Sequence, residues 1–278
     1  MHSTTAEILE ALDEYRTHIA AHNRRALEIY VPWLESITPS EDDLEDMEDG
    51  RAEERKMDFL YQLIGSGAAD HGVEKPRDIL DRYDELCPLL CLDGTLVRPS
   101  DEAERAWARD RHFRTIEEEL KKKALEDVRD TITVPAEMLV LAEHVDSLHG
   151  SGLMDWISEH QVTFWYGPEW HGSSYLAETV MTPDEIREGS SLGAEGWEVA
   201  AGVECGAGEN ATAWIAYCRK ASTDPWEWRY FVERLEYRLD VFDTIPDLLR
   251  WYKTFREQSL VNLPEYEPQD IYNGNTVR

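Results

Sequence analysis

The period of the hydrophobic pattern changes near residue 130, and this change limits which folds the chain can adopt. Before it, apolar residues recur at helical spacing, beginning with Ile8, Leu12, Tyr15 and Ile19. After it, short runs rich in β-branched and aromatic residues follow one another between glycines and prolines. Because the strands cluster instead of alternating with helices, the sequence predicts an α+β fold.

Residues 1–95 are predicted to form a helical N-terminal region. Its first helix begins at a capping box formed by Thr4 and Glu7. We expect Pro32 to break this helix, because proline lacks the N–H that continues the helical ladder. An acidic run at about residues 39–50 contains almost no apolar side chains and indicates a loop.

Residues 96–278 are predicted to form a second region with an irregular C-terminal tail. A long helix from Asp101 to about Val128 leads this region. The expected buried stripe of this helix consists of Trp107, Phe113, Ile116, Leu120 and Ala124.

Residues 196–210, GWEVAAGVECGAGEN, contain four glycines and invite comparison with phosphate-binding loops. Glu209 stands where such a loop would place lysine, and a strand pattern rather than a helix follows. We therefore interpret Gly206-Ala207-Gly208 as a tight turn that requires positive φ. Glu195, Glu204 and Glu209 would then form an acidic rim suited to a basic protein surface.

Other catalytic and metal motifs are weak. No GxSxG motif occurs. Cys205 or Cys218 could pair with His160 or His171, so a hydrolase that uses a cysteine or a carboxylate stays open. His18 and His22 give an HxxxH pair, which alone is an incomplete zinc site. We expect no metal and no cofactor.

The formal net charge of −30 restricts the possible partners. It opposes binding to nucleic acids and to anionic membranes, and it favours a basic protein partner. Solubility and adaptation to salt are alternative reasons for such acidity. The first residues lack an apolar signal segment, and no run approaches the length of a membrane span, so we expect a cytoplasmic protein.

Aromatic residues are dense in the second region. The turn-rich segment WYGPEWHGSS is the best candidate for exposed recognition residues, which would be Trp165, Tyr166, Glu169 and Trp170. These aromatic rings could alternatively form a carbohydrate-binding module, or pack in the core. In WEWRYF, Trp226, Trp228 and Tyr230 share one face of a strand and Glu227, Arg229 and Phe231 share the other, and we expect at most one face to be core.

Two segments resemble a known family. VPAEMLVLAEHVDSLHG (134–150) resembles the opening signature of the SUKH superfamily, a helix that starts at a proline and ends at a glycine. VFDTIPDLLRWY (241–252) resembles its closing element, a short strand followed by a helix with an aromatic end. The resemblance covers roughly residues 125–256, has His149 where the family more often has Asn, and leaves the helical N-terminal region without a counterpart.

The SUKH resemblance implies an α+β domain with a mixed sheet and flanking helices that acts by binding. It implies no catalytic residues and no cofactor. The superfamily includes fungal cell-wall regulators of the Smi/Knr type and bacterial proteins that confer immunity to toxins. The leading hypothesis is therefore a non-enzymatic protein-interaction module that binds a basic protein partner, in toxin immunity or in growth and cell-wall regulation.

Overall fold

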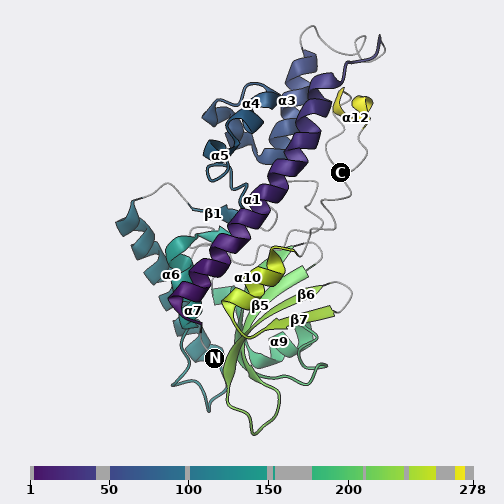
Figure 1. The fold of residues 1–278 in the computed structure, drawn as a ribbon. Helices are drawn as coiled ribbons and strands as arrows, with labels where there is room; N and C mark the ends of the chain where they lie inside the picture. The colour runs from purple at the N-terminus through teal and green to yellow at the C-terminus, as the bar shows by residue number, and fades with distance from the viewer. Residues whose placement is uncertain are drawn as a thin grey trace. The chain divides into compact units, whose positions relative to one another are not determined.

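The α+β class is confirmed by the structure, a computed structural model that combines helices with a five-stranded sheet (Figure 1). The chain divides into two compact units. The first unit comprises Met1–Glu14, Leu96–Gly150 and His160–Tyr252, and the second comprises Tyr15–Thr95, Ser151–Glu159 and Lys253–Arg278. The residues that the structure describes are 3–41, 51–97, 101–148, 153, 177–208, 211–234, 238–254 and 267–272.

The second unit is helical. It contains α1 (Thr5–Ser36) from Tyr15 onward, α3 (Arg51–Ile64), the 3-10 helix η1 (Ser66–His71), α4 (Pro76–Asp81), α5 (Tyr83–Leu86) and α12 (Pro268–Tyr272). Their apolar faces share one core that includes Leu27, Leu34, Leu60, Leu63 and Ile79. These helices therefore depend on one another, because each buries its apolar stripe against the others.

Two predictions for the second unit are wrong. Pro32 lies inside α1 and does not end it, because Val31 and Leu34 on either side are fully buried and hold the helix in place. The tail, predicted to be irregular, contains the short helix α12. The Tyr272 hydroxyl donates to the carbonyl oxygen of Ile37 at 3.2 Å, which ties this helix to the core.

The first unit is built on an antiparallel meander. Its strands are β3 (Val180–Met181), β4 (Glu198–Gly208), β5 (Ala211–Arg219), β6 (Glu227–Arg234) and β7 (Arg238–Phe242), paired in chain order. All four pairs are antiparallel, whereas the SUKH resemblance predicted a mixed sheet. Antiparallel neighbours need only short connections, which suits strands that follow directly in the sequence. β1 (Thr95–Leu96) and β2 (Ser147–Leu148) form a separate two-stranded sheet.

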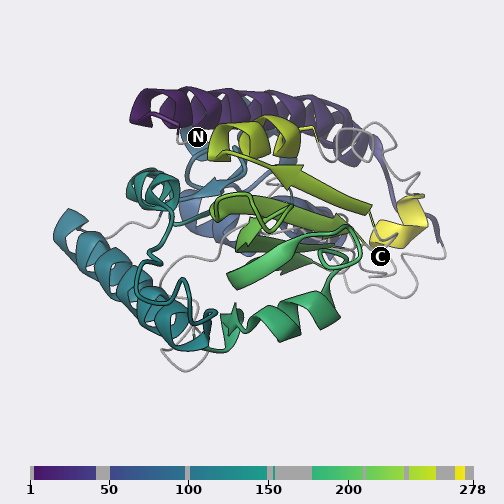
Figure 2. The ribbon, with the colours of Figure 1, turned by 90° about the horizontal axis from the view of Figure 1, so that it is seen from below.

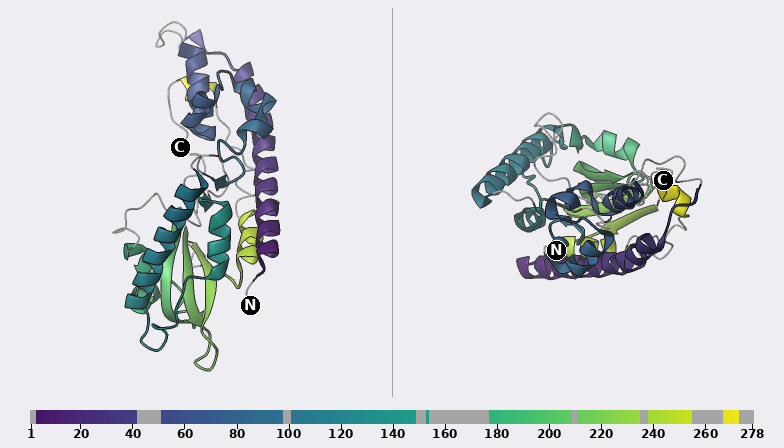
Figure 3. Two further views of the ribbon diagram at one scale, coloured as in Figure 1. Left: turned by 90° about the vertical axis from the view of Figure 1, so that its left-hand side faces the viewer. Right: turned by 90° about the horizontal axis from the view of Figure 1, so that it is seen from above.

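Helices lie on both faces of the five-stranded sheet. Figure 2 shows α9 (Pro183–Gly189) and α10 (Ile245–Tyr252) on opposite sides of the strands. The left view of Figure 3 shows α6 (Glu102–Lys123) and α7 (Ala136–His144) side by side against the strands. We call the face under α6 and α7 the cavity face and the face under α9 the closed face. Tyr230 and Phe231 are consecutive in β6 and point to opposite faces, and both are buried because both faces are covered. The expectation that at most one face of this strand is core is therefore wrong.

The helices of the first unit begin where the sequence predicts. The Asp101 carboxylate accepts from the Glu104 N–H at 2.8 Å and caps α6, and the Thr244 hydroxyl accepts from the Asp247 N–H at 3.2 Å before α10. α6 ends at Lys123 rather than near Val128. Trp107, expected in its buried stripe, is 62% exposed, while the other four members of that stripe are buried.

The glycine-rich stretch belongs mainly to β4. Gly206 and Gly208 are paired with Ala213 and Ala211, so the predicted turn at 206–208 is wrong, and Gly206 is not among the glycines with positive φ. Gly202 has a different reason to be glycine. An added Cβ there would lie 2.6 Å from Ile186 Cδ1 of α9 and 3.1 Å from the carbonyl oxygen of Ile215. The glycine therefore allows α9 to pack closely on β4.

Candidate functional site

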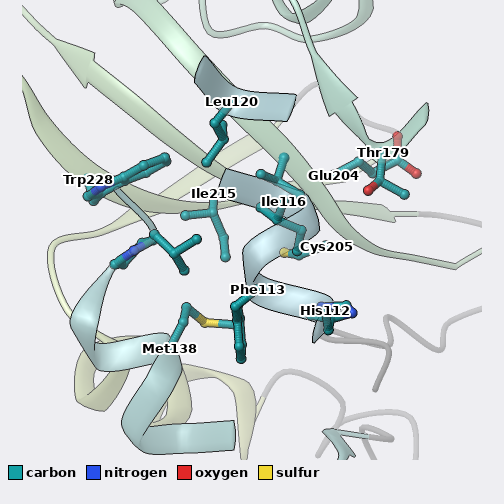
Figure 4. A pocket seen from close by; sticks show the side chains of 13 residues that line it. His112, Phe113, Ile116, Leu120, Met138, Thr179, Glu204, Cys205, Ile215 and Trp228 are labelled. Carbon is teal, nitrogen blue, oxygen red and sulfur yellow. The ribbon is translucent and has the colours of Figure 1, made fainter. Parts of the chain in front are cut away.

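A small apolar cavity lies on the cavity face, between the sheet and helices α6 and α7 (Figure 4). It encloses about 40 Å³, which is room for little more than one small chemical group. Its lining consists of His112, Phe113, Ile116, Leu120, Val134, Pro135, Met138, Thr179, Val203, Glu204, Cys205, Ile215 and Trp228.

Glu204 is the one carboxylate in this apolar lining. Its strand has an irregular register between Glu204 and Gly206, which lets Glu204 and Cys205 line the same cavity although they are consecutive. Figure 4 shows Glu204 beside Thr179, on the side of the cavity away from Trp228. Burial raises the pKa of the Glu204 carboxyl, because the charged form loses solvation without gaining a cation. Glu204 is half-buried and lines the cavity, and its place in the acidic rim stays a prediction.

The two cysteines considered as nucleophiles are buried, one on each face of the sheet. Cys205 lines the cavity, and Cys218 packs in the core cluster of the closed face. Burial raises the pKa of the Cys205 thiol well above its ordinary value and that of the Cys218 thiol to about 12. Both thiols are therefore protonated at neutral pH, and the protonated thiol is a poor nucleophile. The two possible partners, His160 and His171, lie outside the described residues.

A larger and more polar depression, which we call the aromatic groove, lies next to the cavity. It measures about 370 Å³ and forms where the loop before α7 passes over the ends of β5 and β6. Trp228, Val134 and Pro135 line both, so the Trp228 ring is part of the wall between them. The groove is lined by residues 131–137 together with Tyr217, Pro225, Trp226, Glu227, Trp228, Arg229, Tyr230 and Asp243.

Three aromatic rings form one side of the aromatic groove. The Tyr217 ring lies 5.1 Å from the Trp228 ring and 6.3 Å from the Trp226 ring, centroid to centroid. Trp228 Nε1 donates to the carbonyl oxygen of Thr133 at 3.0 Å, which fixes the indole against the loop. On Trp226, the guanidinium carbon of Arg219 lies 4.1 Å from the ring centroid. The rings are thus held in place before any ligand arrives.

Carboxylates outnumber cations around the groove. Arg229 lies between two of them, with Nη2 at 2.5 Å from Glu227 Oε2 and Nε at 2.7 Å from Asp243 Oδ1. Glu137 adds a third, and its buried carboxylate accepts from the Tyr230 hydroxyl at 3.2 Å and from the Ile245 N–H at 2.8 Å. Three carboxylates and one guanidinium leave an excess of negative charge, which favours a cationic ligand.

Most of the residues predicted to bind a partner lie in the part of the chain that the structure does not describe. Trp165, Tyr166, Glu169, Trp170 and Glu209 lie outside the described residues. Glu195 is exposed, and its backbone oxygen accepts from Lys220 Nζ.

Sequence reasoning missed the groove because its residues come from separate segments. Tyr217, Arg229 and Asp243 stand far from the loop at 131–135 in the chain, and only the fold brings them together. The aromatic density of WEWRYF was the available signal, and it did not distinguish a core from a binding surface.

Comparisons with known proteins give no relatives for this chain: no family model matches it, and neither a curated protein nor a solved structure does. Within the described residues, no helix is long and apolar enough to cross a membrane. No group of three or more His, Cys, Asp or Glu side chains is placed to hold a metal ion in that part of the chain. The aromatic groove is the candidate site because it joins aromatic rings with carboxylates in one depression.

Proposed function

We propose that this chain is a non-enzymatic, SUKH-like protein-interaction module of the cytoplasm that binds a basic protein partner. Its binding site is the aromatic groove. The observation that carries the proposal is the combination, in one groove, of three fixed aromatic rings with three carboxylates and a single guanidinium. The role is toxin immunity or growth and cell-wall regulation, and the SUKH resemblance supports it by analogy.

The groove has the properties of a protein-binding hot spot. Tyrosine and tryptophan lose little conformational entropy on binding, and these rings already pack against one another. The volume of about 370 Å³ suits one or two inserted side chains. A positively charged partner would also be attracted from a distance, because the chain carries a net charge of −30.

The buried groups of the cavity support binding over catalysis. The Cys205 thiol has a pKa raised by burial, so it is protonated at neutral pH. His112 and Cys205 line the same cavity, but Glu204 has no hydrogen-bond or ion-pair partner among the described residues. A general acid or base needs a group within hydrogen-bond reach, and none is seen for Glu204 among these residues.

The proposal is tested by affinity capture from native lysate with matched variants. Wild type should capture a basic protein at low salt and release it at high salt, since screening weakens contacts between exposed charges. Trp226→Ala should capture much less of it, because the variant removes one groove ring. Trp107→Ala is the control, because Trp107 is an exposed tryptophan of the same unit outside the groove.

Three outcomes would count against the proposal. Equal capture by wild type and Trp226→Ala would place the partner elsewhere on the chain. Equal loss in Trp226→Ala and Trp107→Ala would indicate nonspecific adhesion to aromatic surfaces. Saturable quenching of tryptophan fluorescence by a neutral oligosaccharide, abolished by Trp226→Ala, would favour the carbohydrate-binding alternative.

A further inference from the structure

The aromatic cluster already holds one guanidinium of its own chain. Arg219 lies over Trp226, with its guanidinium carbon 4.1 Å from the ring centroid. Its Nε is 2.7 Å from Glu198 Oε2, so the same cation also has a carboxylate partner. The pair shows the chemistry that this surface accepts: a planar cation stacked on an indole and held at its edge by a carboxylate.

The groove contains a second set of aromatic rings and carboxylates. The rings of Tyr217 and Trp228 supply π surfaces, and Glu227 and Asp243 supply carboxylates. Arg229 forms an ion pair with each of these two carboxylates. Asp243 is 69% exposed at its side chain, so it is open to a further donor from outside. One guanidinium distributed between two carboxylates leaves acceptor capacity for another.

We propose that the aromatic groove is a receptor for an arginine side chain of the basic partner. The incoming guanidinium stacks on the Tyr217 and Trp228 rings and donates to the Asp243 carboxylate, repeating the arrangement of Arg219 with Trp226 and Glu198. Lysine fits less well, because its ammonium is compact, strongly hydrated and unable to stack in a plane. This inference rests on the proposed function and specifies the side chain that the groove recognises.

The test uses two capped pentapeptides of equal charge, one with two arginines between glycines and one with two lysines. Calorimetric titration at low ionic strength measures the affinity of the full chain for each. We expect the arginine peptide to bind about tenfold more tightly, the difference that stacking of a partly desolvated guanidinium supplies. Tyr217→Leu should abolish this preference, and Asp243→Asn should weaken the binding of the arginine peptide.

Two further variants serve as controls for the peptide titrations. Tyr217→Phe preserves the ring and should keep the arginine preference, so it serves if Tyr217→Leu fails to fold. Trp107→Ala lies outside the groove and should bind like wild type. Equal affinity for both peptides would overturn the arginine assignment while leaving capture of a basic protein intact. An arginine preference that survives in Tyr217→Leu, or no binding of either peptide, would also overturn it.

Discussion

The two faces of the five-stranded sheet bury similar residues but differ in what they can do. On the closed face, Ile186, Leu192, Val199, Trp214 and Phe231 form a core cluster with no charged member. On the cavity face, the same strands meet the buried Glu137, the half-buried Glu204, a small cavity and the aromatic groove. Buried aromatic residues occur on both faces, so they do not identify a binding site. Polar groups beside the rings identify it, because they add orientation and specificity.

The two glutamates of the cavity face show how much the surroundings of a carboxylate matter. Glu137 accepts hydrogen bonds from the Tyr230 hydroxyl and from the backbone N–H groups of Ser3 and Ile245. Glu204 accepts none from the described residues and has a pKa raised by burial. Removing the charge should therefore have opposite effects on stability at the two positions.

The largest expected effect is at Glu137. Glu137→Gln keeps one acceptor oxygen but replaces the other by an amide nitrogen that cannot accept, so at least one donor now paired with the carboxylate loses its partner. We expect a loss of about 2–3 kcal/mol in the free energy of unfolding, measured by urea denaturation. Tyr230→Phe removes one donor alone and should cost less. A Glu137→Gln variant as stable as wild type would show that the three hydrogen bonds do not hold this face together.

The next effect is on the closed face, at Gly202. Gly202→Ala should lower the free energy of unfolding by about 1–3 kcal/mol, since the new Cβ overlaps with Ile186 Cδ1. Ile186→Val removes that terminal carbon, so the double variant should recover part of the loss. Additive losses in the double variant would mean that the close contact of α9 with β4 does not set the requirement for glycine.

Local signals predicted much of this fold from the sequence. The capping box of Thr4 and Glu7, the cap at Asp101 and the helix after Pro135 all appear where expected, because each depends on neighbouring residues alone. The prediction at Pro32 failed because the surrounding core overrides a local preference for ending the helix. The groove could not be predicted, because it depends on the register of β5 and β6 and on the path of the loop at 131–135.

A smaller effect, with a pH dependence, is expected at Glu204. A carboxyl whose pKa is raised in the folded state is harder to ionise there than in the unfolded chain. The folded state therefore loses stability as the pH rises through the ordinary glutamate range towards the raised value. Glu204→Gln should be more stable than wild type at neutral pH, and the difference should vanish at a pH below that range. Glu195→Gln, at an exposed position, is the matched control.

Denaturation of wild type and both variants at several pH values measures this difference. A constant offset between Glu204→Gln and wild type at every pH would show that the carboxyl does not titrate within the cavity. Equal stability of all three proteins at neutral pH would show that Glu204 is well solvated, contrary to its place among Phe113, Ile116 and Leu120.

The smallest expected effect is the difference in alkylation rate between Cys205 and Cys218, which lie on opposite faces of the sheet. Cys205 and Cys218 are buried, and burial raises the pKa of both thiols, so alkylation of the native protein at neutral pH should be slow at each. Mass spectrometry after timed alkylation measures the rates, and the denatured chain gives the rate for exposed thiols. Equal protection means that the cavity face is sealed as well as the closed face. Faster labelling of Cys205 would show that the wall of the cavity opens in solution. The two faces would then differ in dynamics, because only the face that carries the groove would open.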